Sequence, residues 1–260
     1  MKDRTAIDGH VHLYGGMDPA RALIAGFDNL SAASGGATDI CLLLTETSQD
    51  DAFGLLAAGR MAVHGWTVRA LPEDPSALLA TDGRDRRVFL IAGRQIVTRE
   101  GIEVLALATT GRHADGRSVD TVLLDLRASG TPSVLPWGLG KWLGERGRRV
   151  ASLIEADRDH PLLGDNAGRP PGWPDRNLFR ETGPVVIPGT DPLPLPGSET
   201  QIGCYGFVLE GRLDEKQPAR DLAARLFALR SQPDVIGTRR GVLTVLREQA
   251  ALRLRKASRR

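Results

Sequence analysis

The sequence has few cysteines, no long apolar runs and no large excess of either charge, so several classes of protein are excluded. It contains only two cysteines, Cys41 and Cys204, and no C-x-x-C pair, so no disulfide framework is expected. No apolar run approaches the length of a membrane span, and the N-terminus carries no apolar signal segment. The charges nearly balance, with 34 basic and 32 acidic residues, so neither nucleic acid nor a membrane is expected as a partner. A cytoplasmic location is expected by default.

Several common catalytic and nucleotide-binding motifs are also missing. The chain has no G-x-S-x-G, no Walker loop and no G-x-G-x-x-G. Their absence argues against a serine hydrolase, a P-loop enzyme and a Rossmann dehydrogenase.

What the sequence does contain is a repeated alternation of short apolar strands and helices. Residues 38–45 are apolar at nearly every position after Asp39, which suits a strand covered on both faces. Residues 66–108 indicate several short strands, with a hairpin around Gly101. About seven candidate strands predict an α/β protein with a distorted (β/α)7-type barrel. Without a linker or repeat, we expect a single domain over residues 1–260, closed by C-terminal helices at about 215–256.

Two histidines near the N-terminus carry the strongest chemical signal. His10 and His12 end an apolar stretch, residues 6–13, that is typical of a strand. Side chains two positions apart on a strand point to the same face, so both imidazoles would lie on one side. Neutral imidazole is a common ligand of zinc and similar ions, so the pair could bind one metal. The competing interpretation is that both histidines only pack beneath the first loop.

Polar and aromatic residues follow the other predicted strands. In α/β barrels, functional residues gather after the C-terminal ends of the strands. The residues at those positions here are His10, His12, Glu46, Gln95, Trp137, Asp165, Asn166 and Asp191. Packing alone does not require such a set, which therefore indicates a pocket. Two loops rich in proline and glycine, 164–174 and 188–198, could form its walls.

The first and last of these motifs carry a family resemblance. Asp8-Gly9-His10-Val11-His12, followed by a late strand ending in Gly189-Thr190-Asp191, resembles the polymerase and histidinol phosphatase (PHP) superfamily. The order of elements is similar over roughly residues 5–210. The resemblance implies a PHP-like barrel of seven strands, two or three divalent ions and, for many members, hydrolysis of phosphate esters. Amidohydrolases and related enzymes share the paired histidines and the late aspartate.

Several other ligands of that superfamily are replaced in this chain. Gln95 stands where a bridging glutamate is expected, and Leu135 and Leu193 stand where histidines are expected. Glu46 follows the second strand in place of another histidine. The resemblance therefore implies a reduced set of metal ligands: His10, His12, Glu46 and Asp191. Four such ligands could hold one zinc, manganese or iron ion but not a two-metal site, and loss of the ion is the alternative.

Further polar residues are candidates for binding an anionic small molecule. Lys141 follows two glycines at a predicted helix start, where free N–H groups favour anions. Asn166 and Arg169 offer an amide and a guanidinium suited to a planar anion. A surface lysine and an asparagine-stabilised turn are the structural alternatives. The predicted substrate-binding set is Arg94, Gln95, Trp137, Lys141, Asn166 and Arg169.

Together these features predict a PHP-like metal-dependent hydrolase with a reduced metal site. Its substrate would be an anionic small molecule such as a phosphate ester. A water activated by the ion would attack an ester or amide, with Asp191 as a metal ligand or as the catalytic base. The alternative is a non-catalytic protein that binds an anionic ligand or a protein partner on the same scaffold.

Overall fold

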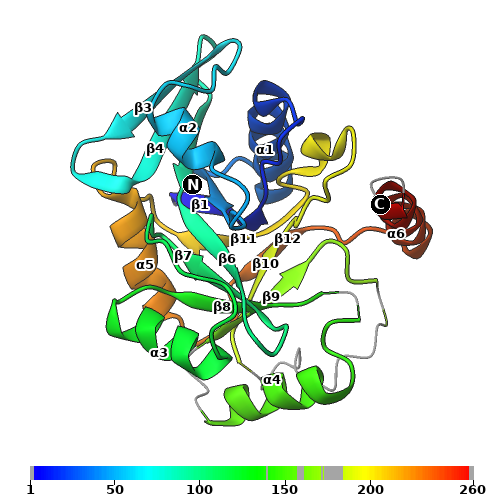
Figure 1. The fold of residues 1–260 in the computed structure, drawn as a ribbon. Helices are drawn as coiled ribbons and strands as arrows, with labels where there is room; N and C mark the ends of the chain where they lie inside the picture. Colours follow the sequence, from blue (N-terminus) through cyan, green and yellow to red (C-terminus); the bar gives the residue numbers. More distant parts are fainter. Residues whose placement is uncertain (1–2, 139, 157–160, 171, 173–183, 258–260) are drawn as a thin grey trace.

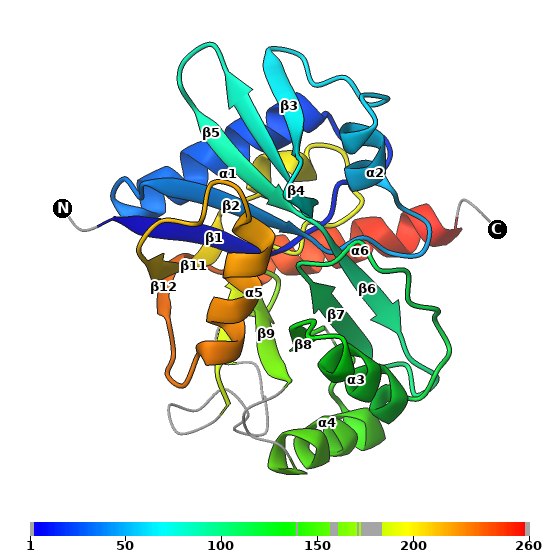
Figure 2. The same ribbon diagram turned by 90° about the vertical axis from the view of Figure 1, so that its left-hand side faces the viewer.

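The strands form two open mixed sheets rather than one closed barrel (Figures 1 and 2). The computed structural model describes residues 3–138, 140–156, 161–170, 172 and 184–257. Within these residues the predicted α/β class is confirmed, whereas the predicted barrel is wrong.

The larger sheet has seven strands and contains both N-terminal strands. In spatial order it comprises β12 (Asp234–Gly237), β11 (Tyr205–Glu210), β1 (Arg4–Val11), β2 (Asp39–Leu44), β5 (Arg87–Ile91), β4 (Asp74–Asp82) and β3 (Trp66–Leu71). β1 lies inside the sheet, parallel to β2 on one side and antiparallel to β11 on the other. It is buried from Thr5 to Val11, so the polar side chains of Thr5, Asp8 and His10 are enclosed together with the apolar ones.

The smaller sheet has five strands and ends with the strand that precedes Asp191. In spatial order it comprises β10 (Val186–Gly189), β9 (Leu162–Asn166), β8 (Ser133–Pro136), β7 (Glu103–Leu107) and β6 (Gly93–Val97). β8, β9 and β10 run parallel, and β6 and β7 form the predicted antiparallel hairpin around Gly101. Gly101 has a φ of +70°, a conformation that glycine adopts without steric cost.

Helices and the space between the sheets bury three apolar clusters. The helices are α1 (Pro19–Ser34), α2 (Ala52–Ala57), α3 (Val119–Ala128), α4 (Gly144–Ala156), α5 (Pro218–Ala228) and α6 (Val242–Ala257), with a 3-10 turn at Ser198–Gln201. One cluster lies between the larger sheet and α1 and α2. A second joins the two sheets to α5, and a third packs the smaller sheet against α3 and α4. Both sheets are therefore covered on both faces.

The barrel prediction was wrong because of the strand that pairs with β2. After β2 the chain makes an antiparallel meander of β3, β4 and β5, and β5 pairs with β2. That pairing occupies the edge of β2 that the next strand of a barrel would use. The chain then bends at Gly93, where a Cβ would lie 2.8 Å from the carbonyl oxygens of Leu44 and Ala106. β6 consequently starts the second sheet instead of extending the first.

The C-terminal region contains two helices, as predicted, with a strand between them. α5 packs between the sheets, β12 pairs with β11, and α6 lies to one side of both sheets (Figure 1). Leu243 and Leu254 of α6 are 71% and 72% exposed, whereas Val245 is buried. Among the described helices, none is both long and apolar enough to cross a membrane.

Candidate metal centre

The carboxylate of Asp8 organises the end of β1. It accepts hydrogen bonds from the backbone N–H of His10 at 3.2 Å and from the N–H and hydroxyl of Thr190 at 2.8 and 2.5 Å. The N–H of Gly203 donates a further bond at 2.8 Å. Burial raises the pKa of Asp8 from 3.8 to about 6, and these hydrogen bonds oppose that rise. Asp8 thus ties β1 to the two chain segments beside it.

β10 passes very close to β1 at this point. A Cβ on Gly189 would lie 2.3 Å from the backbone nitrogen of His10, and one on Gly9 would lie 2.7 Å from the carbonyl oxygen of Pro188. Both positions therefore require glycine. The N–H of Asp191 then donates to the carbonyl of His10 at 2.8 Å, and Asp191 has a φ of +47°. This approach brings the Asp191 side chain to the end of β1.

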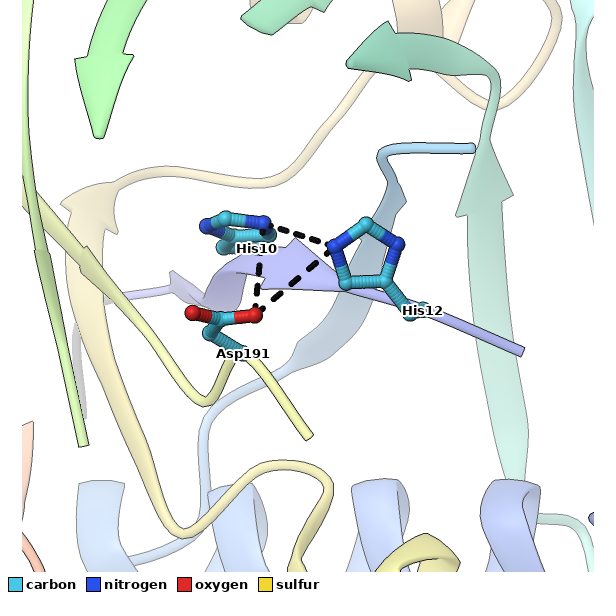
Figure 3. A group of neighbouring side chains, drawn as sticks. All are labelled: His10, His12 and Asp191. Carbon is cyan, nitrogen blue, oxygen red and sulfur yellow. Dashed lines mark hydrogen bonds and ion pairs between the residues drawn. The ribbon is translucent and has the colours of Figure 1, made fainter. Parts of the chain in front are cut away.

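Three of the four predicted metal ligands face one another (Figure 3). The Nε2 atoms of His10 and His12 are 3.0 Å apart, and Oδ1 of Asp191 lies 3.7 Å from each. Both imidazoles are buried, while the Asp191 side chain is 24% exposed. The spacing of the two histidines and the position of Asp191 after a strand thus predicted residues that lie together.

Burial keeps both imidazoles in the neutral form that binds metals. It lowers the pKa of His10 from 6.5 to about 4, and that of His12 to about 3. The charge of Glu103 opposes this change at His10, and hydrogen bonding to Gln95 opposes it at both rings. Nδ1 of His12 is buried without a hydrogen-bond partner among the described residues. The Nε2 atoms of both rings face each other and Asp191, where they could serve as ligands.

The spacing of the donor atoms suits a single ion. Two nitrogens bound at about 2.0–2.1 Å to one zinc ion lie about 3.3 Å apart in a tetrahedral site. The separations of 3.0 and 3.7 Å in the group lie on either side of that value. Two neutral imidazoles and a carboxylate are donors that suit zinc, manganese and iron. His10, His12 and Asp191 therefore form a group that could hold a metal ion.

Glu46, the fourth predicted ligand, has other partners. Its Oε1 accepts a hydrogen bond from the N–H of Phe53 at 2.6 Å, and its Oε2 lies 3.1 Å from Arg94. Arg94 also donates to the carbonyl of Asp50 at 3.1 Å. Burial raises the pKa of Glu46, while Phe53 and Arg94 act in the opposite direction. The pair of Glu46 and Arg94 thus joins the end of β2 and the start of β6 to α2, and Glu46 is not part of the three-residue group.

Gln95 and Lys141 lie beside the imidazoles and share a partner that the sequence analysis missed. Nε2 of Gln95 donates to Oε1 of Glu103 at 3.3 Å, and the Lys141 ammonium pairs with the same oxygen. The β6–β7 hairpin places Gln95 opposite Leu105, so Glu103, two positions away, lies on the same face. The hairpin predicted around Gly101 could therefore have indicated that Glu103 lies beside Gln95. Lys141 is therefore neutralised by Glu103.

Asn166 holds the carboxylate of Asp191. Its side-chain N–H groups donate to Oδ2 of Asp191 and to the carbonyl of Trp137, both at 2.8 Å. The Trp137 side chain is buried in the third apolar cluster. Asn166 therefore contacts a candidate metal ligand, and the backbone carbonyl of Trp137 holds the Asn166 side chain in place.

Arg169 has a structural partner in Asp165. Its guanidinium donates to both oxygens of Asp165, at 2.7 and 2.9 Å, and both side chains are buried. The hydroxyl of Tyr205 donates to the same carboxylate at 2.9 Å. Arg169 is thus neutralised within the protein. Of the predicted loop 164–174, residues 171, 173 and 174 lie outside the described residues.

Tyr14 is a further neighbour that the sequence analysis missed. Its ring stacks on His12, with centroids 5.0 Å apart and an interplanar angle of 18°. Burial and the charges of Asp191 and Asp50 raise the pKa of Tyr14 above its ordinary value. Tyr14 lines a cleft of about 340 Å³, and Gln95 lines a second cleft of about 270 Å³. Asp50 borders both clefts, which therefore adjoin each other.

Fold and site together define an α/β protein of two open mixed sheets with a buried His-His-Asp group where β10 meets β1. No family model and no curated protein matches the chain. Among solved structures, it is similar to the crystal structure of PsfC from Pseudomonas syringae PB-5123. The TM-score is 0.61 with 16% sequence identity, over 96% of this chain and 99% of PsfC. Identity this low shows a common fold alone.

The expected membership of the PHP superfamily is wrong. The sheets are open, no family model for that superfamily matches, and the fold follows PsfC over nearly the full length. The resemblance depended on a histidine pair and a late aspartate, which are too few residues to define a family. The replacements at Gln95, Leu135 and Leu193 consequently no longer argue that a metal site was lost. The prediction of a non-catalytic protein drew on those replacements, and the prediction of phosphate-ester hydrolysis drew on the same resemblance, so the fold tests neither.

Proposed function

We propose that the protein is a hydrolase that uses one divalent ion, zinc, manganese or iron, held by His10, His12 and Asp191. The observation that carries the proposal is the convergence of two buried, neutral imidazoles and one partly buried carboxylate, next to a cleft lined by Tyr14, which stacks on His12. Two histidines and a carboxylate, with the remaining position open, are the ligand set of several hydrolytic zinc sites. Such an ion lowers the pKa of a bound water and makes it a nucleophile at neutral pH.

The surroundings favour Asp191 as a ligand over Asp191 as a base. Oδ2 accepts the hydrogen bond from Asn166, which leaves Oδ1 facing the two imidazoles. Asn166 therefore orients the carboxylate, as residues behind metal ligands commonly do. Asp8 does the same for the backbone, because it holds both His10 and Thr190.

The substrate is a small molecule with an ester-type bond and one oxyanionic or carbonyl group, such as a phosphate ester. Arg94, Lys141 and Arg169, the cations nominated from sequence, are paired with Glu46, Glu103 and Asp165. Paired cations attract a polyanion weakly, so recognition of the substrate oxygen depends on the ion.

Metal analysis of protein purified without chelator tests the proposal. We expect close to one equivalent of zinc, manganese or iron per chain, and only trace metal in the His10→Ala/His12→Ala variant. His64→Ala is the matched control because His64 is exposed, and it should retain the metal. Substoichiometric metal in both the wild type and the double variant would refute the metal site. Iron with oxygen-dependent turnover would contradict a hydrolase, since two histidines and a carboxylate also serve in iron oxygenases.

A further inference from the structure

The larger cleft, of about 340 Å³, is lined by residues other than the three candidate metal ligands. Its walls come from the loop after β1, the loop after β10 and the last turns of α6. The side chains that line it include Tyr14, Met17, Asp50, Leu195, Leu252 and Arg255. The guanidinium of Arg255 donates to the carbonyl of Pro194, so α6 is anchored to the loop that follows Asp191. The cleft thus borders the loops that follow His12 and Asp191 in the chain.

Tyr14 connects this cleft to the candidate ligands. Its ring stacks on His12, and its position after Leu13 fixes it just beyond the end of β1. Among the described residues, no group forms a hydrogen bond with the Tyr14 hydroxyl, and that oxygen is not among the buried unpartnered atoms. A phenol is protonated at neutral pH, so it offers a hydrogen-bond donor to a molecule in the cleft.

The rest of the cleft wall is partly apolar and partly polar, since Asp50 and Arg255 also line it. Met17, Leu195 and Leu252 lie on it together with Pro194 and Pro196. A cleft with apolar walls and a few placed polar groups is typical of small-molecule sites. This cleft therefore offers a phenol and an apolar surface beside one acidic and one basic side chain, Asp50 and Arg255.

We infer that this cleft binds the substrate, which carries an apolar group next to the oxygen that reacts. The Tyr14 hydroxyl donates a hydrogen bond to the substrate oxygen at the metal, and Met17, Leu195 and Leu252 contact the apolar group. Tyr14 is thereby a catalytic residue for the proposed hydrolysis, because it stabilises the charge that develops on that oxygen. This inference rests on the proposed function, since it requires an ion on His10, His12 and Asp191.

Titration of the cobalt(II)-loaded protein with acetate and with benzoate tests the inference through the visible absorption of cobalt. Benzoate should bind at least about tenfold more tightly than acetate, because its ring is buried against the apolar wall. Tyr14→Phe keeps the stacked ring and should weaken both anions by about five- to tenfold. Leu195→Ser should weaken benzoate alone, whereas Leu124→Ser, at a 67% exposed leucine on α3, should change neither.

The outcomes separate the inference from the proposed function. If cobalt gives no visible band that depends on His10 and His12, the proposed function fails and the inference fails with it. If cobalt binds but benzoate and acetate bind equally, the apolar part of the inference is overturned. If cobalt binds and Tyr14→Phe leaves both affinities unchanged, Tyr14 does not donate to the bound oxygen. In the last two cases the metal site itself stands.

Discussion

At the scale of single residues, sequence spacing predicted some residues of the site and not others. His10 and His12 follow from the alternation of side chains on a strand, and Asp191 follows from its position after one. Asp8 could not be assigned, because its partners Thr190 and Gly203 lie 182 and 195 positions away in the sequence. Local patterns carry no information on contacts across that distance, so the residue that fixes the ligands stayed hidden.

Asp8→Asn should weaken both folding and metal binding. An asparagine offers one acceptor oxygen in place of two, so Gly203 or Thr190 would lose its partner in a buried site. We expect a loss of about 1–3 kcal/mol in the free energy of unfolding, measured by urea denaturation. Metal affinity should fall by about ten- to a hundredfold, because Asp8 orients the ligands.

Asp74→Asn is the matched control for this variant. Asp74 is also buried and accepts hydrogen bonds from Ala219 and Arg220 at the start of α5. This variant should be destabilised while its metal affinity stays unchanged. Equal metal affinity in Asp8→Asn and the wild type would show that Asp8 does not position the ligands.

Glu46→Gln distinguishes a structural glutamate from a metal ligand. The substitution removes the charge facing Arg94 but keeps an oxygen for the N–H of Phe53. Leaving Arg94 short of its partner should cost about 1–3 kcal/mol of unfolding free energy. The metal content should remain that of the wild type. A lower metal content with an unchanged free energy of unfolding would show that Glu46 is a metal ligand.

At the scale of elements, the helices and most strands were predictable, whereas the partners of the strands were not, apart from the β6–β7 hairpin around Gly101. The cap of α1 illustrates a local signal, since Asp18 accepts hydrogen bonds from Ala20 and Arg21 and precedes Pro19. By contrast, the pairing of β5 with β2 depends on a meander whose strands could equally have continued a barrel. Periodicity identifies a strand but not its neighbour in the sheet.

Gly189→Ala tests the close approach of β10 to β1. The added Cβ would overlap the backbone of His10, so β10 must move and carry Asp191 with it. We expect a loss of about 3 kcal/mol in unfolding free energy and loss of metal binding. Gly15→Ala is the control, because nothing lies within 4 Å of the Cβ position. If Gly189→Ala and Gly15→Ala bind metal equally well, the close approach of β10 to β1 is not what positions Asp191.

At the scale of the whole molecule, the candidate ligands join two sheets that no shared strand connects. β1 belongs to the larger sheet, and Asp191 follows β10 of the smaller one. An ion held by all three ligands would therefore cross-link the sheets in the folded state only. Ligands that bind the folded state alone stabilise it in proportion to the logarithm of their concentration.

Metal should consequently raise the melting temperature of the protein. At a free zinc concentration one hundred times Kd, the gain is about 2.7 kcal/mol, which corresponds to roughly 5–10 °C for a chain of this size. EDTA should reverse the shift, and the His10→Ala/His12→Ala variant should show none. An equal shift in the double variant would place the bound metal elsewhere.

Anomalous diffraction from a zinc-soaked crystal, recorded above and below the zinc edge, tests the central claim most directly. The account predicts one strong peak at about 2.0–2.3 Å from Nε2 of His10, Nε2 of His12 and a carboxylate oxygen of Asp191. No peak at these three residues, or a peak bound by other side chains, would contradict it.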